Sequence, residues 1–116
     1  MPSIAILGAS AQRTKFGNRA VRAYQGQGWT VYPIHPTETE IEGLRVFASI
    51  KDVPGPLDRA SLYLPPHIGI TLLADIAAIG AKQLWVNPGS GDEALIAKAE
   101  SLGLNVIEAC SLLAAY

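Results

Sequence analysis

The apolar positions of this chain fall into short runs that predict buried strands. The runs cover residues 3–7, 29–34, 59–64, 83–87 and 104–107. Mostly apolar runs of this length are typical of strands buried on both faces of a sheet. The first four are followed within two residues by glycine or proline, which marks the turn that ends each strand.

The segments between the runs predict three helices. The first is capped by Asn18 and extends to about residue 27, with apolar residues on one face. The second begins at Pro66, a residue suited to the first turn of a helix, and ends at Gly80. The third covers residues 92–103, where two acidic residues favour the start of a helix.

Residues 35–58 are the least regular part of the pattern. Within them, residues 41–47 predict a turn with a short strand, and residues 49–56 predict a brief helical turn broken by two prolines. The rest of the chain alternates strand and helix with short connections, which predicts βαβ units with helices on both faces of the sheet. The expected fold is therefore an α/β sandwich of three layers, with a mostly parallel sheet of five or six strands.

The length and composition narrow the class of protein. A chain of 116 residues suits one domain, so a single domain over residues 1–116 is expected. No apolar run approaches the roughly 20 residues that span a bilayer, and the first residues lack the features of a signal peptide. Cys110 is the only cysteine, which excludes an internal disulfide and a cysteine metal cluster, so a cytoplasmic location is expected.

The charge changes this picture only locally. The net charge of −1 gives no general attraction to nucleic acid or to membranes. The sequence leaves homo-oligomerisation open. Four basic residues, however, fall within ten positions with no acidic residue among them: Arg13, Lys15, Arg19 and Arg22. A local cationic segment on a nearly neutral chain favours a small anion as the ligand.

The candidate site follows from the predicted sheet. In an open parallel sheet, ligands bind beyond the carboxyl ends of the strands. Those ends carry turns rich in glycine, proline and small polar residues, at residues 8–10, 34–36, 64–66 and 87–89. We therefore expect these four turns to be neighbours in space.

The first turn and the residues after it have the composition of a phosphate-binding loop. A strand, a glycine turn and a helix start leave free backbone N–H groups that point at an anion. Gly8 would allow the tight turn, Ser10 offers a hydroxyl, and Gly17 would allow close approach at the helix start. Arg13 and Lys15 would add positive charge beside the phosphates.

Two features of the sequence differ from those of an NAD-binding protein. The G-x-G-x-x-G fingerprint is incomplete, because only Gly8 is present in the turn 8–10. The end of the second strand also lacks the acidic residue that binds the ribose hydroxyls of NAD, since it reads Ile34-His35-Pro36. Coenzyme A, whose ribose carries a 3′-phosphate that a carboxylate would repel, is favoured over NAD.

Five motifs, in this order, resemble a known family. They are Ile-Leu-Gly-Ala-Ser at residues 6–10, Phe-Gly-Asn at 16–18, Val-Tyr-Pro-Ile-His-Pro at 31–36, Ile-Glu-Gly-Leu at 41–44 and Leu-Pro-Pro at 64–66. The chain resembles the stand-alone CoA-binding domain proteins, which look like the nucleotide-binding domain of the succinyl-CoA synthetase alpha subunit on its own. The resemblance covers nearly the whole chain, from Ile4 to Cys110.

This resemblance implies a Rossmann-type fold with coenzyme A, or an acyl-CoA, lying across the carboxyl ends of the strands. The loop 8–10 would hold the pyrophosphate with help from Arg13, the segments around Pro36 and 64–65 would flank the adenine, and residues 88–89 would lie near the pantetheine arm. The cofactor-binding residues expected on this basis are Gly8, Ala9, Ser10, Arg13, Phe16, Gly17, Asn18, His35, Pro36, Leu64, Pro65, Pro66, Pro88 and Gly89.

The chain departs from the family at two points. The family commonly has asparagine where this chain has His35, so the polar contact at that position stays open. The second domain of the synthetase, with its phosphorylated histidine, is absent from these residues, which removes the grounds for expecting ligase activity. The expected function is therefore non-catalytic binding of CoA, with a small nucleotide as the partner. Two alternatives stay open: an NAD(P)-binding or redox-sensing domain, and an interaction protein whose fold has lost its ligand.

Cys110 is expected to be a small buried residue or, alternatively, to face the CoA thiol.

Overall fold

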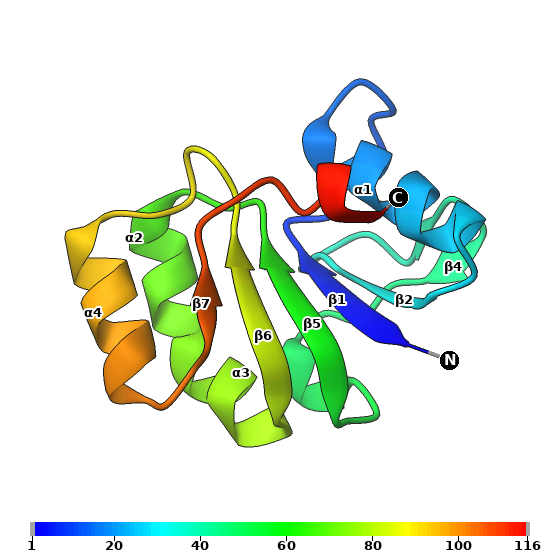
Figure 1. Cartoon of the computed structure of the whole chain (residues 1–116). Helices are drawn as coiled ribbons and strands as arrows, with labels where there is room; N and C mark the ends of the chain where they lie inside the picture. Colours follow the sequence, from blue (N-terminus) through cyan, green and yellow to red (C-terminus); the bar gives the residue numbers. More distant parts are fainter. Residues whose placement is uncertain (1, 116) are drawn as a thin grey trace.

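The computed structural model describes residues 2–115 and contains a central sheet of five parallel strands (Figure 1). The strand order is β2-β1-β5-β6-β7, so the direction of the crossovers reverses between β1 and β5. The strands are β1 (Ser3–Leu7), β2 (Thr30–Ile34), β5 (Leu57–Leu62), β6 (Ala81–Val86) and β7 (Val106–Ile107). The predicted fold class is confirmed.

Four strands, β2, β5, β6 and β7, begin or end one or two residues away from their predicted bounds. β5 starts two residues earlier than predicted, since Leu57 already pairs with Ala81. β7 is shorter than the predicted strand because the N–H of Leu104 donates to the carbonyl oxygen of Ala99 at 3.1 Å. That bond closes the end of the preceding helix, so Leu104 cannot join the ladder.

Helices connect the strands and cover both faces of the sheet (Figure 1). They are α1 (Phe16–Gly26), α2 (Pro66–Gly69), α3 (Leu73–Ile79) and α4 (Glu93–Ser101). One buried core cluster contains residues of α3 and α4, and a second contains residues of α1 on the other face. Among residues 2–115, no helix is long and apolar enough to cross a membrane.

The predicted start of the first helix is wrong. Lys15 occupies the N-cap position, and its side chain makes no capping hydrogen bond. Asn18 lies inside α1 and is fully buried, because its amide is used by the preceding loop and by the carboxylate of Glu42. A side chain with two such partners does not serve the backbone N–H groups of its own helix.

The predicted helix over residues 66–79 is divided. Pro66 does occupy its first turn and Gly80 does end it with a left-handed φ of 84°. Between them, residues Ile70–Leu72 form a 3-10 turn that separates α2 from α3. The hydroxyl of Thr71 donates to the carbonyl of Ile68 at 2.6 Å, and such local side-chain bonds favour departures from regular α-helix.

Residues 40–45 of the irregular segment form a small β-hairpin. It consists of β3 (Glu40–Ile41) and β4 (Leu44–Arg45), which pair antiparallel. Glu42 and Gly43 form the turn, with φ values of 50° and 78°. Two successive positive φ values match the twist of a two-residue hairpin turn.

A buried polar cluster joins the C-terminal segment to the ends of β5 and β6. The hydroxyl of Ser111 lies 2.6 Å from that of Ser61 and 3.0 Å from that of Tyr63, while its N–H donates to Asn87 at 2.7 Å. The phenol of Tyr24 donates to the carbonyl of Ser111 at 2.6 Å. Burial raises the pKa of both Tyr24 and Tyr63 above the ordinary value of 10.0.

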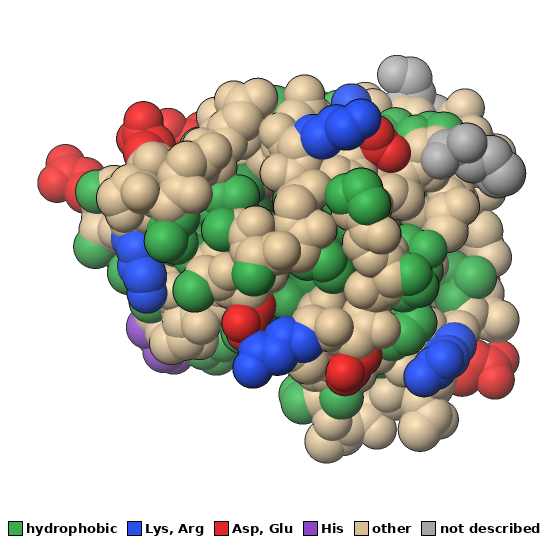
Figure 2. Space-filling view, turned by 90° about the horizontal axis from the view of Figure 1, so that it is seen from below, with side chains coloured by type: hydrophobic (Ala, Val, Ile, Leu, Met, Phe, Trp, Pro, Cys, Tyr) green, Lys and Arg blue, Asp and Glu red, His purple; other side chains and the backbone are tan. Residues whose placement is uncertain are grey.

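The amino ends of the strands have a mixed, exposed charge. Figure 2 views this end from below and shows acidic and basic side chains next to one another. Lys82 lies 3.3 Å from Asp58, and the backbone N–H of Ser3 donates to the same carboxylate at 2.9 Å. The N–H bond from Ser3, with the ion pair to Lys82, lowers the pKa of Asp58. This end therefore offers no concentrated charge to a ligand.

Candidate functional site

A cavity of about 790 Å³ opens at the carboxyl ends of β1, β2, β5 and β6. It lies at the reversal point of the sheet, between β1 and β5, where ligands of such folds bind. Its volume is in the range of pockets for small ligands and cofactors. All four turns expected to be neighbours contribute to its lining, so they do meet at this end of the sheet.

The structure brings ten of the fourteen expected residues into the cavity lining. They are Gly8, Ala9, Ser10, Phe16, Gly17, His35, Pro36, Leu64, Pro88 and Gly89. The other four lie outside the lining. Pro65 and Pro66 form the start of α2, Asn18 is buried behind the first loop, and the side chain of Arg13 is directed to Glu42.

Further lining residues were not among the expected fourteen. They are Leu7, Lys15, Ile34, Ala48, Ser49, Ile50, Tyr63, Ile68, Leu72 and Ser90. Lys15 carried a signal, since it belongs to the basic segment. Ala48, Ser49 and Ile50 come from the irregular part of the chain, where no pattern connected them to the strand ends.

The first loop and α1 meet at backbone contact. Gly8 has a φ of 91°, and a Cβ there would collide with the carbonyl oxygen of Tyr63. A Cβ on Gly17 would collide with the carbonyl oxygen of Gly8. Both positions therefore require glycine, Gly8 because of its conformation as well as its neighbours.

The first loop contains unpaired N–H groups, and two of its residues, Ala9 and Ser10, line the cavity. Within residues 2–115, no group accepts a hydrogen bond from the N–H of Ala9, Ser10 or Ala11. The first turn of α1 also has neither a side-chain cap nor an acidic residue. Free N–H groups at the positive end of a helix dipole favour an anion.

The charge of the lining agrees with an anionic ligand. Among the described residues that line the cavity, Lys15 is the one with a full positive charge, and none is aspartate or glutamate. A ligand with several phosphates would meet one cation, a row of N–H groups and no opposing carboxylate. A free ribose diol would find no acidic acceptor.

His35 occupies the position of the missing acidic residue. Its Nδ1 accepts hydrogen bonds from the backbone N–H groups of Thr37, at 3.1 Å, and Glu38, at 3.0 Å. A neutral imidazole that accepts at Nδ1 carries its hydrogen on Nε2. His35 therefore offers the cavity a hydrogen-bond donor, which suits a phosphate oxygen.

Much of the remaining lining is apolar and reaches the protein surface. Ile50, Leu64 and Leu72 form part of it, and two exposed apolar side chains also line it: Phe16, 56% exposed, and Ile68, 41% exposed. The guanidinium of Arg19 lies 5.1 Å from the centre of the Phe16 ring. Cys110 is half-buried and is not among the lining residues.

These features define a class of protein: a Rossmann-type α/β domain with an open loop after its first strand and no acidic residue among the described residues that line its cavity. Comparisons with known proteins identify the family within this class. Residues 2–116 match the family model described as a CoA binding domain. The chain belongs to this CoA-binding domain family.

The relatives include enzymes and small proteins. The chain is 31% identical over 80 residues to subunit alpha of the ADP-forming acetate–CoA ligase II from Pyrococcus furiosus, which covers 68% of this chain and 18% of the ligase subunit. It is 30% identical over 89 residues to the uncharacterized protein YneT of Bacillus subtilis, covering 72% of this chain and 66% of YneT. The chain thus spans about a fifth of the length of the ligase subunit.

Solved structures agree with the fold. A conserved hypothetical protein from Pyrococcus furiosus superposes with a TM-score of 0.89 at 28% identity, covering 98% of this chain and 99% of that one. A dinucleotide forming acetyl-coenzyme A synthetase from Ca. Korarchaeum cryptofilum, in complex with phosphate and ADP, superposes with a TM-score of 0.81 at 30% identity. That match covers 92% of this chain and 25% of the synthetase.

Proposed function

We propose that this protein binds coenzyme A, or an acyl-CoA, in the cavity at the carboxyl ends of its strands and performs no chemistry on it. The observation that carries the proposal is the first loop, where the N–H groups of Ala9, Ser10 and Ala11 are unpaired among the described residues and Lys15 is the cation beside them. Membership in the CoA-binding domain family supports the identity of the ligand.

The parts of coenzyme A have suitable partners in the lining. The pyrophosphate would lie on the first loop, with Lys15 beside it. The phosphorylated adenosine would lie towards His35 and Pro36, where the Nε2 donor suits a 3′-phosphate. The pantetheine arm would follow the apolar side chains to Pro88 and Gly89. The absence of an acidic residue from the described lining argues against the free ribose of NAD.

The proposal gives the residues of the lining no catalytic role. Among the described residues, His35 does not contact any of the lining serines, and its Nδ1 is already used by two backbone N–H groups. No nucleophile and base therefore lie in hydrogen-bond contact within the lining, as covalent catalysis requires.

Calorimetric titration of coenzyme A, dephospho-CoA, NAD and NADP into the purified protein tests the proposal. We expect saturable binding of coenzyme A, weaker binding of dephospho-CoA, and weak or undetectable binding of both dinucleotides. Lys15→Ala should weaken coenzyme A roughly tenfold, because one charge-assisted contact is lost. Lys82→Ala removes an exposed lysine at the opposite end of the strands and serves as the matched control. It should leave the affinity for coenzyme A unchanged. Tight binding of NAD or NADP without coenzyme A would overturn the proposal.

A further inference from the structure

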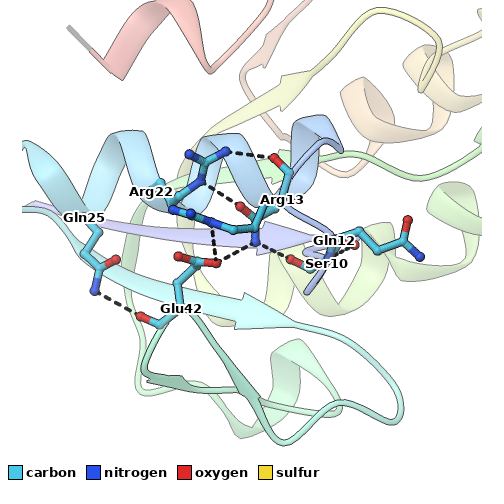
Figure 3. A network of polar contacts seen from close by, with 7 residues as sticks. Ser10, Gln12, Arg13, Arg22, Gln25 and Glu42 are labelled. Carbon is cyan, nitrogen blue, oxygen red and sulfur yellow. Dashed lines mark hydrogen bonds and ion pairs between the residues drawn. The ribbon is translucent and has the colours of Figure 1, made fainter.

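Behind the first loop, Asn18 holds a fully satisfied set of hydrogen bonds. Its side chain is completely buried, and its Nδ2 donates both to the carbonyl of Ser10, at 2.8 Å, and to the carboxylate of Glu42, at 3.1 Å. Its Oδ1 accepts from Nε of Arg22 at 2.8 Å. Figure 3 shows this network between α1, the first loop and the hairpin.

The loop is anchored to α1 at two carbonyl groups. Asn18 holds the carbonyl of Ser10, and Nη2 of Arg22 donates to the carbonyl of Arg13 at 2.8 Å. In a trans peptide unit the C=O and the following N–H point in opposite directions. Because the carbonyl of Ser10 is held towards α1, the N–H of Ala11 points the other way, away from the helix side chains.

Glu42 completes the network from a different part of the chain. It is the one residue other than glycine with a positive φ among residues 2–115, at 50°, in the hairpin turn. Its carboxylate accepts from Asn18 and lies 3.4 Å from Nε of Arg13, and its carbonyl accepts from Gln25 at 3.4 Å. A glutamate in this conformation is unfavourable on its own, so the contacts of its side chain stabilise it there.

We propose that Glu42 is a positioning residue for the phosphate-binding loop. It fixes the amide of Asn18, which in turn holds the carbonyl of Ser10 and leaves the N–H groups of residues 9–11 open to the ligand. Arg13 belongs to the same network, because its guanidinium supplies the positive charge that pairs with the carboxylate of Glu42. This inference rests on the proposed function, because it concerns how the same loop takes a pyrophosphate.

Glu42→Gly and Glu42→Gln separate this role from a purely structural one. Glycine removes the carboxylate but suits the positive φ of the turn, so the variant should fold with a melting temperature close to that of the wild type. Glutamine keeps an oxygen that can accept from Asn18. We expect Glu42→Gly to weaken coenzyme A and ADP by a similar factor, about five- to twentyfold, and Glu42→Gln to remain within about threefold of the wild type.

Calorimetric titration of coenzyme A and ADP into the wild type and both variants gives the answer. Unchanged or tighter binding by Glu42→Gly would overturn the inference, since Glu42 would then be neutral or would compete with the phosphates for Arg13. Equal weakening in both variants would also overturn it, because the hydrogen bond to Asn18 would not explain the loss. A wild type that does not bind coenzyme A would instead contradict the proposed function, so the two failures are distinguishable.

Discussion

Two helices that begin at the carboxyl ends of the strands, α1 and α4, start in opposite ways. At α4 the side chain of Asp92 accepts a hydrogen bond from the N–H of Leu95 at 2.9 Å, and Glu93 adds a second negative charge in the first turn. At α1 the N-cap is Lys15, without a side-chain bond and without an acidic residue in the first turn. One helix start is satisfied by its own carboxylates, whereas the other is open to an external anion.

Under the proposed function, the start of α1 lacks local stabilising contacts where the chain would bind its ligand. A side-chain cap contributes about 1 kcal/mol to a helix, and acidic residues near its start add to this. α1 lacks both, and its loop instead has free N–H groups and a lysine. A missing cap beside a glycine turn therefore marks the ligand site better than the glycine turn alone.

The largest effect is expected from making α1 resemble α4. Lys15→Asp introduces a capping carboxylate at a position whose backbone already has the extended conformation of an N-cap. The free energy of unfolding should rise by about 0.5–1 kcal/mol, whereas the affinity for coenzyme A should fall roughly a hundredfold, because a positive charge beside the pyrophosphate becomes negative. Urea unfolding and calorimetry measure the two quantities. A variant that lost stability and kept its affinity would break the comparison.

The contact between the first loop and α1 should give the next largest effect. In Gly17→Ala the added methyl group meets the carbonyl oxygen of Gly8, so the loop must shift away from the helix. We expect a loss of about 1–3 kcal/mol in stability and a more than tenfold loss in affinity for coenzyme A. Gly26→Ala is the matched control in the same helix, because a Cβ there has no neighbour within 4 Å. It should be neutral or stabilising by up to about 1 kcal/mol.

The reciprocal change at α4 should affect stability alone. Asp92→Ala removes the bond to the N–H of Leu95, which should lower the free energy of unfolding by about 1 kcal/mol. The affinity for coenzyme A should stay within about twofold, because Asp92 does not line the cavity. Chemical denaturation and calorimetry on the same sample test this. A large change in affinity would mean that the start of α4 also belongs to the site.

The smallest effect is expected in the pH dependence of stability at alkaline pH, which depends on the phenols of Tyr24 and Tyr63. Burial raises the pKa of Tyr63 and of Tyr24 above 10.0, while Arg59 opposes the shift at Tyr24. The folded state therefore favours the neutral phenols. Their contribution to stability is complete below pH 10 and is lost as the pH rises through the raised pKa values.

Tyr63→Phe isolates one of these groups. At neutral pH it should lower the free energy of unfolding by about 1 kcal/mol, because the bond to Ser111 is lost. Above pH 10 its stability should decrease less steeply than that of the wild type, which unfolding curves at several pH values would show. Parallel curves would mean that Tyr63 does not titrate differently in the folded state.

The order of strands and helices could be predicted from the sequence because each element carries its own pattern. The apolar runs and the glycine or proline after them are local signals, as are Pro66 and Gly80 at the ends of the second helical segment. Asn18 was wrongly predicted to cap the first helix because that prediction also used only a local signal. Its identity matches a cap, but its partners, Ser10 and Glu42, come from a loop and from a hairpin 24 residues away.

The site could be predicted in part. Turns at the strand ends meet whenever a parallel sheet forms, so Gly8, Leu64 and Pro88 were found from position alone. Ser49 and Ile50 were missed because only the packing of the irregular segment brings them to the cavity. The direction of the Arg13 side chain depends on one carboxylate in the hairpin, Glu42, and no local pattern connects the two residues.

The most direct test of the account is a titration of the ¹⁵N-labelled protein with coenzyme A, followed by amide chemical shifts. The account predicts that the largest shifts belong to the N–H groups of Ala9, Ser10 and Ala11, with those of Phe16 and Gly17 next. The N–H groups at the start of α4, from Glu93 to Leu95, should stay nearly unchanged. Saturable binding with the largest shifts at α4, or with no shift in the first loop, would contradict the claim that the first loop and the open start of α1 hold the phosphates.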